Sequence, residues 1–481
     1  MKLNTRINLC KTFKEDAAVI FISNHADQLP EAWFSLSEAK YIQKKLEAGT
    51  DTAAIITAQG CKFFHQPDPK LPKEKQMEKA RINANKICNN LRDEKLETVT
   101  LVATTDNNTT LAYIEGLLLS TYRFEKYKSK KSDYLLQEIN LVADITEEQL
   151  KRLKATTQGV FAARHLVNEP ANALDAIQLT QQMQEWGKTY GFKVQILHKE
   201  EIAREKMGGL LAVNQGSTTP PTFTILEWKP EAASGKPIVL IGKGVMFDTG
   251  GINLKVQPGG LDDMKSDMAG AAAVIGTFIA AADANLPVHL VGLIPATDNR
   301  PGNNAIVPGD IITMHDGTTV EILNTDAEGR LILADAISYA HQYDPQLIVE
   351  LSTLTGSTVM ALGSQGMAAM GTADNNLFAQ LEEAGNAVYE RIARFPFWEE
   401  YEELIKSDVA DIKNIGAREA GAITAGKFLS HFTSHPFIHL DIAGVAYSRK
   451  ENGYRGHGAS GSGVRLLLEF ISGMTNHAIK A

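Results

Sequence analysis

The chain has 481 residues, of which 44% are hydrophobic and 22% are charged, a composition typical of a globular protein with two or three domains. The first 150 residues hold 21 basic and 21 acidic side chains, so the net charge of −9 arises in the rest of the chain. This distribution lacks the basic surface expected of a nucleic-acid-binding protein, and no apolar stretch is long enough to span a membrane.

Residues 1–14 contain no apolar core, so we expect no signal peptide, and the three cysteines, Cys10, Cys61 and Cys88, lack CxxC spacing. Such cysteines are typical of buried or free thiols in a reducing compartment and not of a structural zinc site. We therefore expect a cytoplasmic protein with neither a membrane nor a nucleic acid as its partner.

The N-terminal third mixes strand and helix patterns. Strands are predicted at 15–22 and 97–103, and helices near 36–47 and 74–92, because their apolar residues recur with strand or helix periodicity. This is a smaller N-terminal α/β domain, over 1–145, without a reactive cluster of side chains. A long amphipathic helix over 146–168, stopped by Pro170, is predicted to link it to the next domain.

After the linking helix, a second predicted domain covers 169–481, where short β-branched runs alternate with helices. This alternation favours a larger C-terminal α/β domain with a mostly parallel sheet flanked by helices. Sheets of this kind bind ligands beyond the carboxyl ends of their strands. The candidate strands are 193–197, 222–228, 237–241, 288–294, 347–351 and 438–442.

Four carboxylates lie in loops beside these strands or at helix starts: Asp248, Asp267, Asp326 and Glu328. Each alone is most simply a surface charge, and residues 325–328 also match a capping box at the start of a helix. Four carboxylates gathered at one strand end would repel each other, and two divalent cations would neutralise them. A dinucleotide site is excluded, because Phe247 stands where that motif needs glycine, and the phosphate P-loop motif is absent.

Several collinear motifs resemble the leucine (cytosol) aminopeptidase family. The longest is NTDAEGRL, residues 324–331, and the resemblance covers about 160–470 of the chain. Two departures concern Phe437 and Ala446, neither of which belongs to the motifs that carry the chemistry. The other matching segments are 168–172, 242–244, 247–251, 264–268, 308–310, 353–356, 421–423 and 439–444.

The resemblance implies a metal-dependent aminopeptidase with two divalent ions, manganese or zinc. Asp248 and Glu328 would bridge both ions, Asp326 would complete one site, and Lys243 and Asp267 would complete the other. A lysine can serve as a ligand when nearby cations and burial favour its neutral amine.

Two further residues have catalytic roles in the family. Lys255 would polarise the scissile carbonyl and stabilise the gem-diolate. Arg330 would hold a bicarbonate that acts as general base.

The family resemblance also implies the substrate and the assembly. The substrates would be peptides with a free N-terminus, and the enzyme would be a homo-oligomer, a hexamer. An apolar pocket would favour an aliphatic first residue. An aminopeptidase-fold protein with an added DNA-binding or regulatory role is the alternative. The pocket positions are Met264, Thr353, Leu354, Gly356, Ala443 and Ala446.

Overall fold

A computed structural model describes residues 3–12, 17–25, 29–31, 33–58, 60–132, 134–256 and 260–480. The chain forms two compact units. The N-terminal unit comprises Met1–Thr157 and Glu451–Gly456, and the C-terminal unit comprises Gln158–Lys450 and His457–Ala481. The division falls within helix α4 (Glu147–Asn168), at the place where a linking helix is expected.

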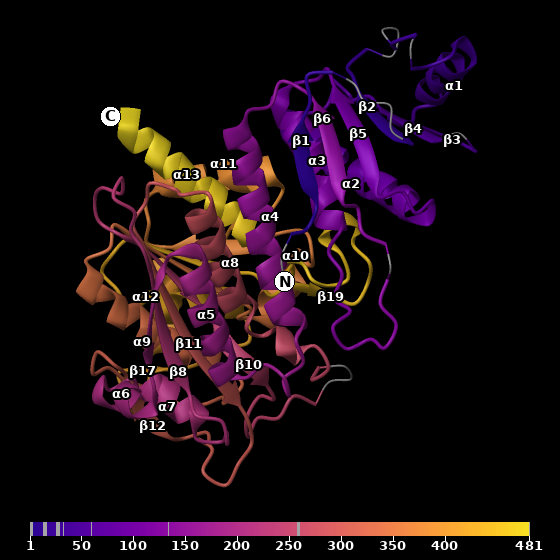
Figure 1. The fold of residues 1–481 in the computed structure, drawn as a ribbon. Helices are drawn as coiled ribbons and strands as arrows, with labels where there is room; N and C mark the ends of the chain where they lie inside the picture. The colour runs from indigo at the N-terminus through magenta and orange to yellow at the C-terminus, as the bar shows by residue number, and fades with distance from the viewer. Residues whose placement is uncertain are drawn as a thin grey trace. The chain divides into compact units, whose positions relative to one another are not determined.

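The N-terminal unit is a six-stranded sheet covered by helices on both faces (Figure 1). All neighbouring strands are parallel except β3 and β4. Helices α2 (Lys73–Asp93) and α3 (Asn107–Ser120) pack on one face, and α1 (Leu36–Glu47) covers the other. In sheet order the strands are β1 (Arg6–Leu9), β6 (Glu138–Val142), β5 (Thr98–Ala103), β2 (Ala18–Ile22), β4 (Gly60–His65) and β3 (Thr52–Thr57).

The predicted strand at 15–22 is only partly described, because residues 15 and 16 lie outside the described residues. Successive residues of β2 pack into different clusters, Ile20 with α2 and α3, and Phe21 with α1. A strand buried on both faces explains why this segment is continuously apolar.

The C-terminal unit is built on a nine-stranded sheet whose centre is parallel. Strands β18, β14, β9, β11 and β10 run in the same direction, whereas β15, β8 and β7 introduce antiparallel pairs. The bounds are β7 (Lys193–Leu197), β8 (Thr222–Trp228), β9 (Ile238–Gly242), β10 (Gly244–Asp248), β11 (Leu290–Asn299), β14 (Leu347–Ser352), β15 (Met367–Gly371), β16 (Ile392–Arg394) and β18 (Phe437–Asp441).

Helices cover both faces of this sheet, so the predicted fold class is confirmed (Figure 1). The first face carries α5 (Ala176–Tyr190) and α8 (Ala269–Asp283), with α13 (Val464–Lys480) packed on α8. The opposite face carries α7 (Gly208–Asn214), α9 (Gly329–Tyr339) and α12 (Gly421–Ser430). The remaining helices are α6 (Lys199–Arg204), α10 (Gly356–Leu362) and α11 (Asn375–Val388).

Short elements complete the C-terminal part of the chain. Strands β12 (Ile311–Thr313), β13 (Thr319–Glu321) and β17 (Ile412–Lys413) form a small sheet, and β19 (Tyr447–Ser448) pairs with β20 (Gly458–Ala459). The 3-10 helices are η2 (Met264–Ser266), η3 (Ala340–Tyr343), η4 (Glu399–Ile405) and η5 (Gly453–Arg455).

The segment Glu451–Gly456 belongs to the N-terminal unit although it lies near the end of the sequence. The buried carboxylate of Glu78 accepts a hydrogen bond from the Tyr454 hydroxyl at 2.8 Å and pairs with Arg455 at 2.9 Å. A second buried pair in this unit joins Arg81 to Glu115. Tyr454 and Arg455 therefore bind a buried carboxylate on α2, although they lie near the end of the sequence.

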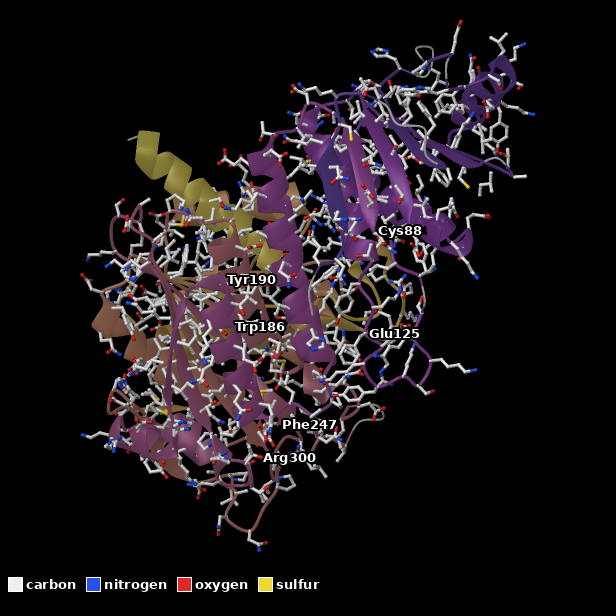
Figure 2. All side chains as sticks on the ribbon, viewed as in Figure 1. Cys88, Glu125, Trp186, Tyr190, Phe247 and Arg300 are labelled. Carbon is white, nitrogen blue, oxygen red and sulfur yellow. The ribbon has the colours of Figure 1, made fainter. Side chains whose placement is uncertain are left out.

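All three cysteines are free thiols, as the sequence predicted, and Cys61 and Cys88 are buried. Burial raises the pKa of Cys88, on α2, to about 11 (Figure 2), so its thiol is protonated at neutral pH. Among the described residues, none of the helices is long and apolar enough to cross a membrane.

Candidate active site

The parallel strands of the C-terminal unit bring polar side chains to one edge of the sheet. Lys243 follows β9, Asp248 ends β10, Thr353 follows β14, and Asp441 ends β18. Because these strands are parallel, their carboxyl ends meet at the same edge. Strand β10 itself was not predicted, since its glycine-rich sequence indicated a bending loop. Gly244 allows β10 to pair closely with β11, because any larger residue would place its Cβ 2.4 Å from the Pro295 carbonyl oxygen.

The other acids reach this edge from helix starts. Asp267 follows η2 and precedes α8, whereas Asp326 and Glu328 precede α9. Carboxylate oxygens of Asp248, Asp326 and Glu328 lie within 4.8 Å of one another. No other group of at least three His, Cys, Asp or Glu side chains with metal-site spacing occurs in the described ranges. The structure thus brings the acids selected from the sequence together.

The capping-box interpretation of residues 325–328 is wrong. Helix α9 begins at Gly329 with Glu328 as its N-cap residue, and no side chain caps it. The Thr325 hydroxyl instead donates to the Gly250 carbonyl at 2.6 Å and accepts from the Asn253 amide at 2.9 Å. Thr325 therefore fastens the loop after β10 beside the acids, and it leaves the carboxylate of Glu328 available to the site.

Two lysines lie among the carboxylates. The Lys243 Nζ is 2.9 Å from Asp267 Oδ2 and 3.0 Å from Glu328 Oε1. The Lys255 Nζ is 2.8 Å from Asp248 Oδ2 and 2.6 Å from Asp326 Oδ1. The four carboxylates outnumber the two ammonium groups, which leaves the cluster with an excess of negative charge.

Glycine leaves space next to Lys243. A Cβ built at Gly329 would lie 2.5 Å from the Lys243 Cε and 2.6 Å from its Nζ. The glycine of the NTDAEGRL motif therefore makes room for the lysine that arrives from β9.

Burial and crowding perturb the cluster. Burial raises the pKa of the Glu328 and Asp267 carboxyls, and the neighbouring Asp248 raises both further. Burial opposes the ammonium form of Lys243, but Asp267, Glu328 and Asp248 outweigh it and raise its pKa. Perturbed groups that converge in a cavity are typical of functional sites.

The donor set fits divalent cations. Buried oxygens of Asp267 (Oδ2), Asp326 (Oδ1) and Glu328 (Oε1) accept no well-aligned hydrogen bond, and their lysine contacts are ion pairs. Carboxylate oxygens with one amine nitrogen suit manganese or zinc. Buried, incompletely satisfied oxygens are costly unless a cation uses them.

Arg330 lies behind the acids. Its Nη1 donates to the Asn414 carbonyl at 2.8 Å, whereas its buried Nε has no hydrogen-bond partner among the described residues. Burial lowers its pKa to about 10 although Glu328 and Asp441 oppose the shift, so it is a cation at neutral pH. Its unused N–H groups suit an anion.

Sequence reasoning missed two supporting residues. Asn299, the last residue of β11, donates from Nδ2 to Asp248 Oδ1 at 2.8 Å and to the Thr325 carbonyl at 3.1 Å. The next residue, Arg300, lies with its guanidinium 4.7 Å from the Phe247 ring centroid (Figure 2). The ends of β10 and β11 are thereby fixed together, and the signal in the sequence was the polar end, Thr297–Asn299, of an otherwise apolar strand.

Asp441 is the second missed residue, although its segment was recognised as a motif. Its buried carboxylate accepts hydrogen bonds from the hydroxyls of Thr355 at 2.6 Å and Thr358 at 2.8 Å, and from the Leu354 amide at 3.2 Å. It thus holds the loop after β14, where Thr353 donates to Asp267 Oδ1 at 2.7 Å.

A cavity of about 720 Å³ opens over these residues. Ala446 is 4% exposed and is not among the described residues that line the cavity, so its role in a substrate pocket stays a prediction. The lining includes Lys243, Asp248, Lys255, Asp267, Asp326, Arg330 and the pocket positions Met264, Thr353, Leu354, Gly356 and Ala443.

Comparisons with known proteins agree on one family. Residues 161–468 match the model of the cytosol aminopeptidase family, catalytic domain. The chain is 48% identical over 377 residues to the "Probable cytosol aminopeptidase" of Chlorobium limicola, covering 75% of this chain and 74% of that protein. The protein of the same name from Geobacter sp. (strain M21) is 43% identical over 364 residues, 74% of each chain.

A solved structure resembles nearly the whole chain. The bottromycin maturation enzyme BotP in complex with Mn aligns with a TM-score of 0.85 and 28% identity, covering 96% of this chain and 100% of that one. The similarity therefore extends through both units, whereas the family model begins within α4.

Proposed function

The chain belongs to the cytosol aminopeptidase family and is a metallo-exopeptidase, and we propose that it uses two divalent cations to release an aliphatic N-terminal residue from peptides. The excess of carboxylates over lysines at one edge of the C-terminal sheet is the observation that carries the proposal. Peptides with a free N-terminus are the proposed substrates.

Five residues would hold the ions. Asp248 and Glu328 would bridge both, Asp326 would complete one site, and Lys243 and Asp267 would complete the other. Manganese or zinc, when bound, would lower the pKa of water and supply a hydroxide nucleophile near neutral pH. The carboxylates match these ions in charge, and Lys243 can bind one only after it loses its proton.

Lys255 would act on the substrate carbonyl. Burial opposes its ammonium form, but Asp248 and Asp326 outweigh burial and raise its pKa, so the group remains positive at neutral pH. A fixed ammonium can stabilise the negative charge that develops on the carbonyl oxygen. Lys255 lines the cavity and is partly exposed, which allows contact with a substrate.

Arg330 would hold the general base. The buried Nε without a hydrogen-bond partner in the described part of the chain supports an anion at this position, and a bicarbonate would accept a proton there. The guanidinium would position the anion by charge and hydrogen bonds.

The first side chain of the substrate would lie against an apolar wall. Met264, Leu354 and Ala443 line the cavity beside the acids, so an aliphatic side chain would gain about 0.8 kcal/mol per buried methylene. An acidic side chain would lose hydration without gaining a partner. We further propose a cytoplasmic homohexamer; sedimentation that finds only monomers in active samples would exclude that assembly.

Metal binding provides the main test. Native mass spectrometry and elemental analysis should find two manganese or zinc ions per chain, and a chelator should remove both the ions and the release of leucine from leucyl peptides. Asp326→Asn should lose at least one ion, because it removes a charged ligand from the cluster. Asp262→Asn is the matched control, since its exposed carboxylate pairs with Arg449 at 3.1 Å.

Full peptidase activity in a sample shown to be free of metal would disprove the proposal. Equal metal content in Asp326→Asn and the control would disprove the ligand assignment alone.

A further inference from the structure

A second cavity, of about 810 Å³, lies between α10, the start of α12 and the segment after β16. Its lining includes Val359 and Met360 on α10, Phe395 after β16, and Ile423 on α12. Val359 is 41% exposed and Met360 is 88% exposed. An apolar residue exposed to this degree at a cavity is a candidate contact for a ligand.

The floor of this cavity is apolar. Ala422 packs with Ala368 and Met370 in a small hydrophobic cluster, against which Phe395 also packs. A ligand group placed here would contact side chains that are already fixed by the core, so little ordering would be needed on binding.

The second cavity adjoins the active-site cavity. Both are lined by Gly356, Ser357, Val359, Arg418 and Gly421. At the shared boundary, a Cβ at Gly421 would lie 2.5 Å from Ser357 Oγ, whereas a Cβ at Gly356 would meet nothing within 4 Å. The boundary therefore combines three small residues, Gly356, Ser357 and Gly421, with the larger side chains of Val359 and Arg418.

Arg418 gives the boundary its charge. Among the described residues that line the second cavity, it is the only one with a charged side chain. An exposed guanidinium beside an apolar surface suits a ligand that carries both a carboxylate and apolar side chains. The downstream part of a short peptide has this chemistry.

We propose that the second cavity binds the residues of a peptide substrate beyond the scissile bond. An apolar side chain contacts Met360, Val359 and Phe395, and the C-terminal carboxylate of a short peptide pairs with Arg418. This inference rests on the proposed aminopeptidase function and adds to it a preference for short peptides with an apolar downstream residue. An extended chain spans about 3.3 Å per residue, and because the two cavities share lining residues, a peptide that begins in one would continue into the other.

The test compares substrates that share the same first residue. Leucine amide occupies only the active-site cavity, whereas Leu-Gly-Leu and Leu-Gly-Ser extend beyond it. For the intact metal-loaded enzyme, we expect kcat/KM to be about three- to tenfold higher for Leu-Gly-Leu than for Leu-Gly-Ser, as burial of one apolar side chain allows. Amidation of the C-terminus of Leu-Gly-Leu should lower kcat/KM by a similar factor.

Two variants locate the effect. Met360→Ser should remove most of the preference for Leu-Gly-Leu over Leu-Gly-Ser, and Arg418→Gln should remove the effect of amidation. Val409→Ser is the matched control, because Val409 is also an exposed apolar residue of the C-terminal unit, at 64%, and lines neither cavity. Its substrate ratios should equal those of the unmodified enzyme.

Three outcomes would overturn the inference. The two tripeptides could be cleaved equally, or Met360→Ser could retain the preference. Alternatively, Met360→Asp could change the sedimentation of the protein but leave the ratio of kcat/KM for Leu-Gly-Leu to that for Leu-Gly-Ser unchanged. The surface around Met360 would then be an interface between copies of the chain. Failure to cleave leucine amide as well as both peptides would instead contradict the proposed function.

Discussion

The two units share a fold class but place their buried charges differently. In the N-terminal unit, buried charges lie on helices, where Glu78 and Arg81 of α2 face partners such as Tyr454 and Glu115. In the C-terminal unit, others also lie on helices, but one group, Lys243, Asp248, Asp267 and Glu328, gathers at the edge where strands end. A parallel sheet offers a ligand-binding edge in both cases, so the side chains placed at that edge, and not the fold, decide whether chemistry follows.

The edge of the N-terminal sheet illustrates the difference. Ser23 follows β2 and Thr104 follows β5, at the carboxyl ends of two parallel strands, as Lys243 follows β9 in the other sheet. Both are held by backbone hydrogen bonds to the adjacent strand, Ser23 to His65 and Thr104 to Ile22. Their neutral side chains leave no excess charge for a cation to neutralise.

The largest difference between the units should appear when a lysine is removed from each. Lys255→Ala should lower kcat about 10²–10³-fold, because a preorganised positive group is lost at the reacting carbonyl. Lys62→Ala removes a lysine of the N-terminal unit that pairs with Glu38 at 2.9 Å, and it should leave kcat unchanged. Steady-state kinetics on leucyl peptides measures both.

Metal content separates a catalytic role of Lys255 from a structural one. Elemental analysis should find the same number of ions in Lys255→Ala as in the unmodified enzyme. Loss of both ions from this variant would contradict the assigned role.

A smaller contrast concerns pH and the N-terminal unit. Burial lowers the pKa of His65 to about 4, so the folded unit binds fewer protons than the unfolded chain between pH 4 and 6.5. The contribution of neutral His65 to the free energy of unfolding should be fully present above pH 6.5. It should fall by about 3 kcal/mol as the pH is lowered to 4. Hydrogen exchange of the β4 amides at pH 4.5 and 7 measures this change, and His65→Gln should reduce it. An unchanged pH dependence in that variant would exclude His65 as the cause.

The smallest expected effect is a change in the stability of the C-terminal unit with pH. Its sign is opposite, because this unit loses stability as the pH rises. Burial lowers the pKa of His439, but Glu350 beside it outweighs burial and raises the pKa above 6.5. The pair therefore stabilises the unit at pH 6.5 and below, and this contribution is lost as the pH rises through the folded-state pKa. Hydrogen exchange of the β18 amides should show the loss. This loss of stability at higher pH should disappear in the double variant His439→Gln, Glu350→Gln. A loss that persists in the double variant would contradict its assignment to the His439–Glu350 pair.

The sequence predicted the central strands β9, β14 and β18 to within one residue at each end because they are apolar, and two strands near the sheet edge were also placed correctly. Strands β7 and β8 have the predicted bounds, Lys193–Leu197 and Thr222–Trp228. The acids of the candidate site were found because they follow such strands or open helices. Local patterns were sufficient in these cases because neighbouring parallel strands must end at the same edge.

Other features depend on contacts between distant residues. Strand β10 was missed because its glycine permits close approach to Pro295, a contact that the local sequence does not encode. Asn299 and Asp248 are 51 positions apart, and Asp441 and Thr355 are 86 apart. Thr325 was assigned to a helix cap because a short pattern cannot show that its hydroxyl bonds to Gly250, 75 residues earlier.

The segment Glu451–Gly456 has a consequence for the order in which the protein is completed on the ribosome. Glu78 and Tyr454 are 376 residues apart, an interval that takes roughly 20 to 75 s to translate at typical rates of synthesis. Until then the N-terminal unit lacks two of the residues that bind the buried carboxylate of Glu78, although Arg81 lies 3.7 Å from it. The N-terminal unit is therefore completed only after most of the C-terminal unit has been made.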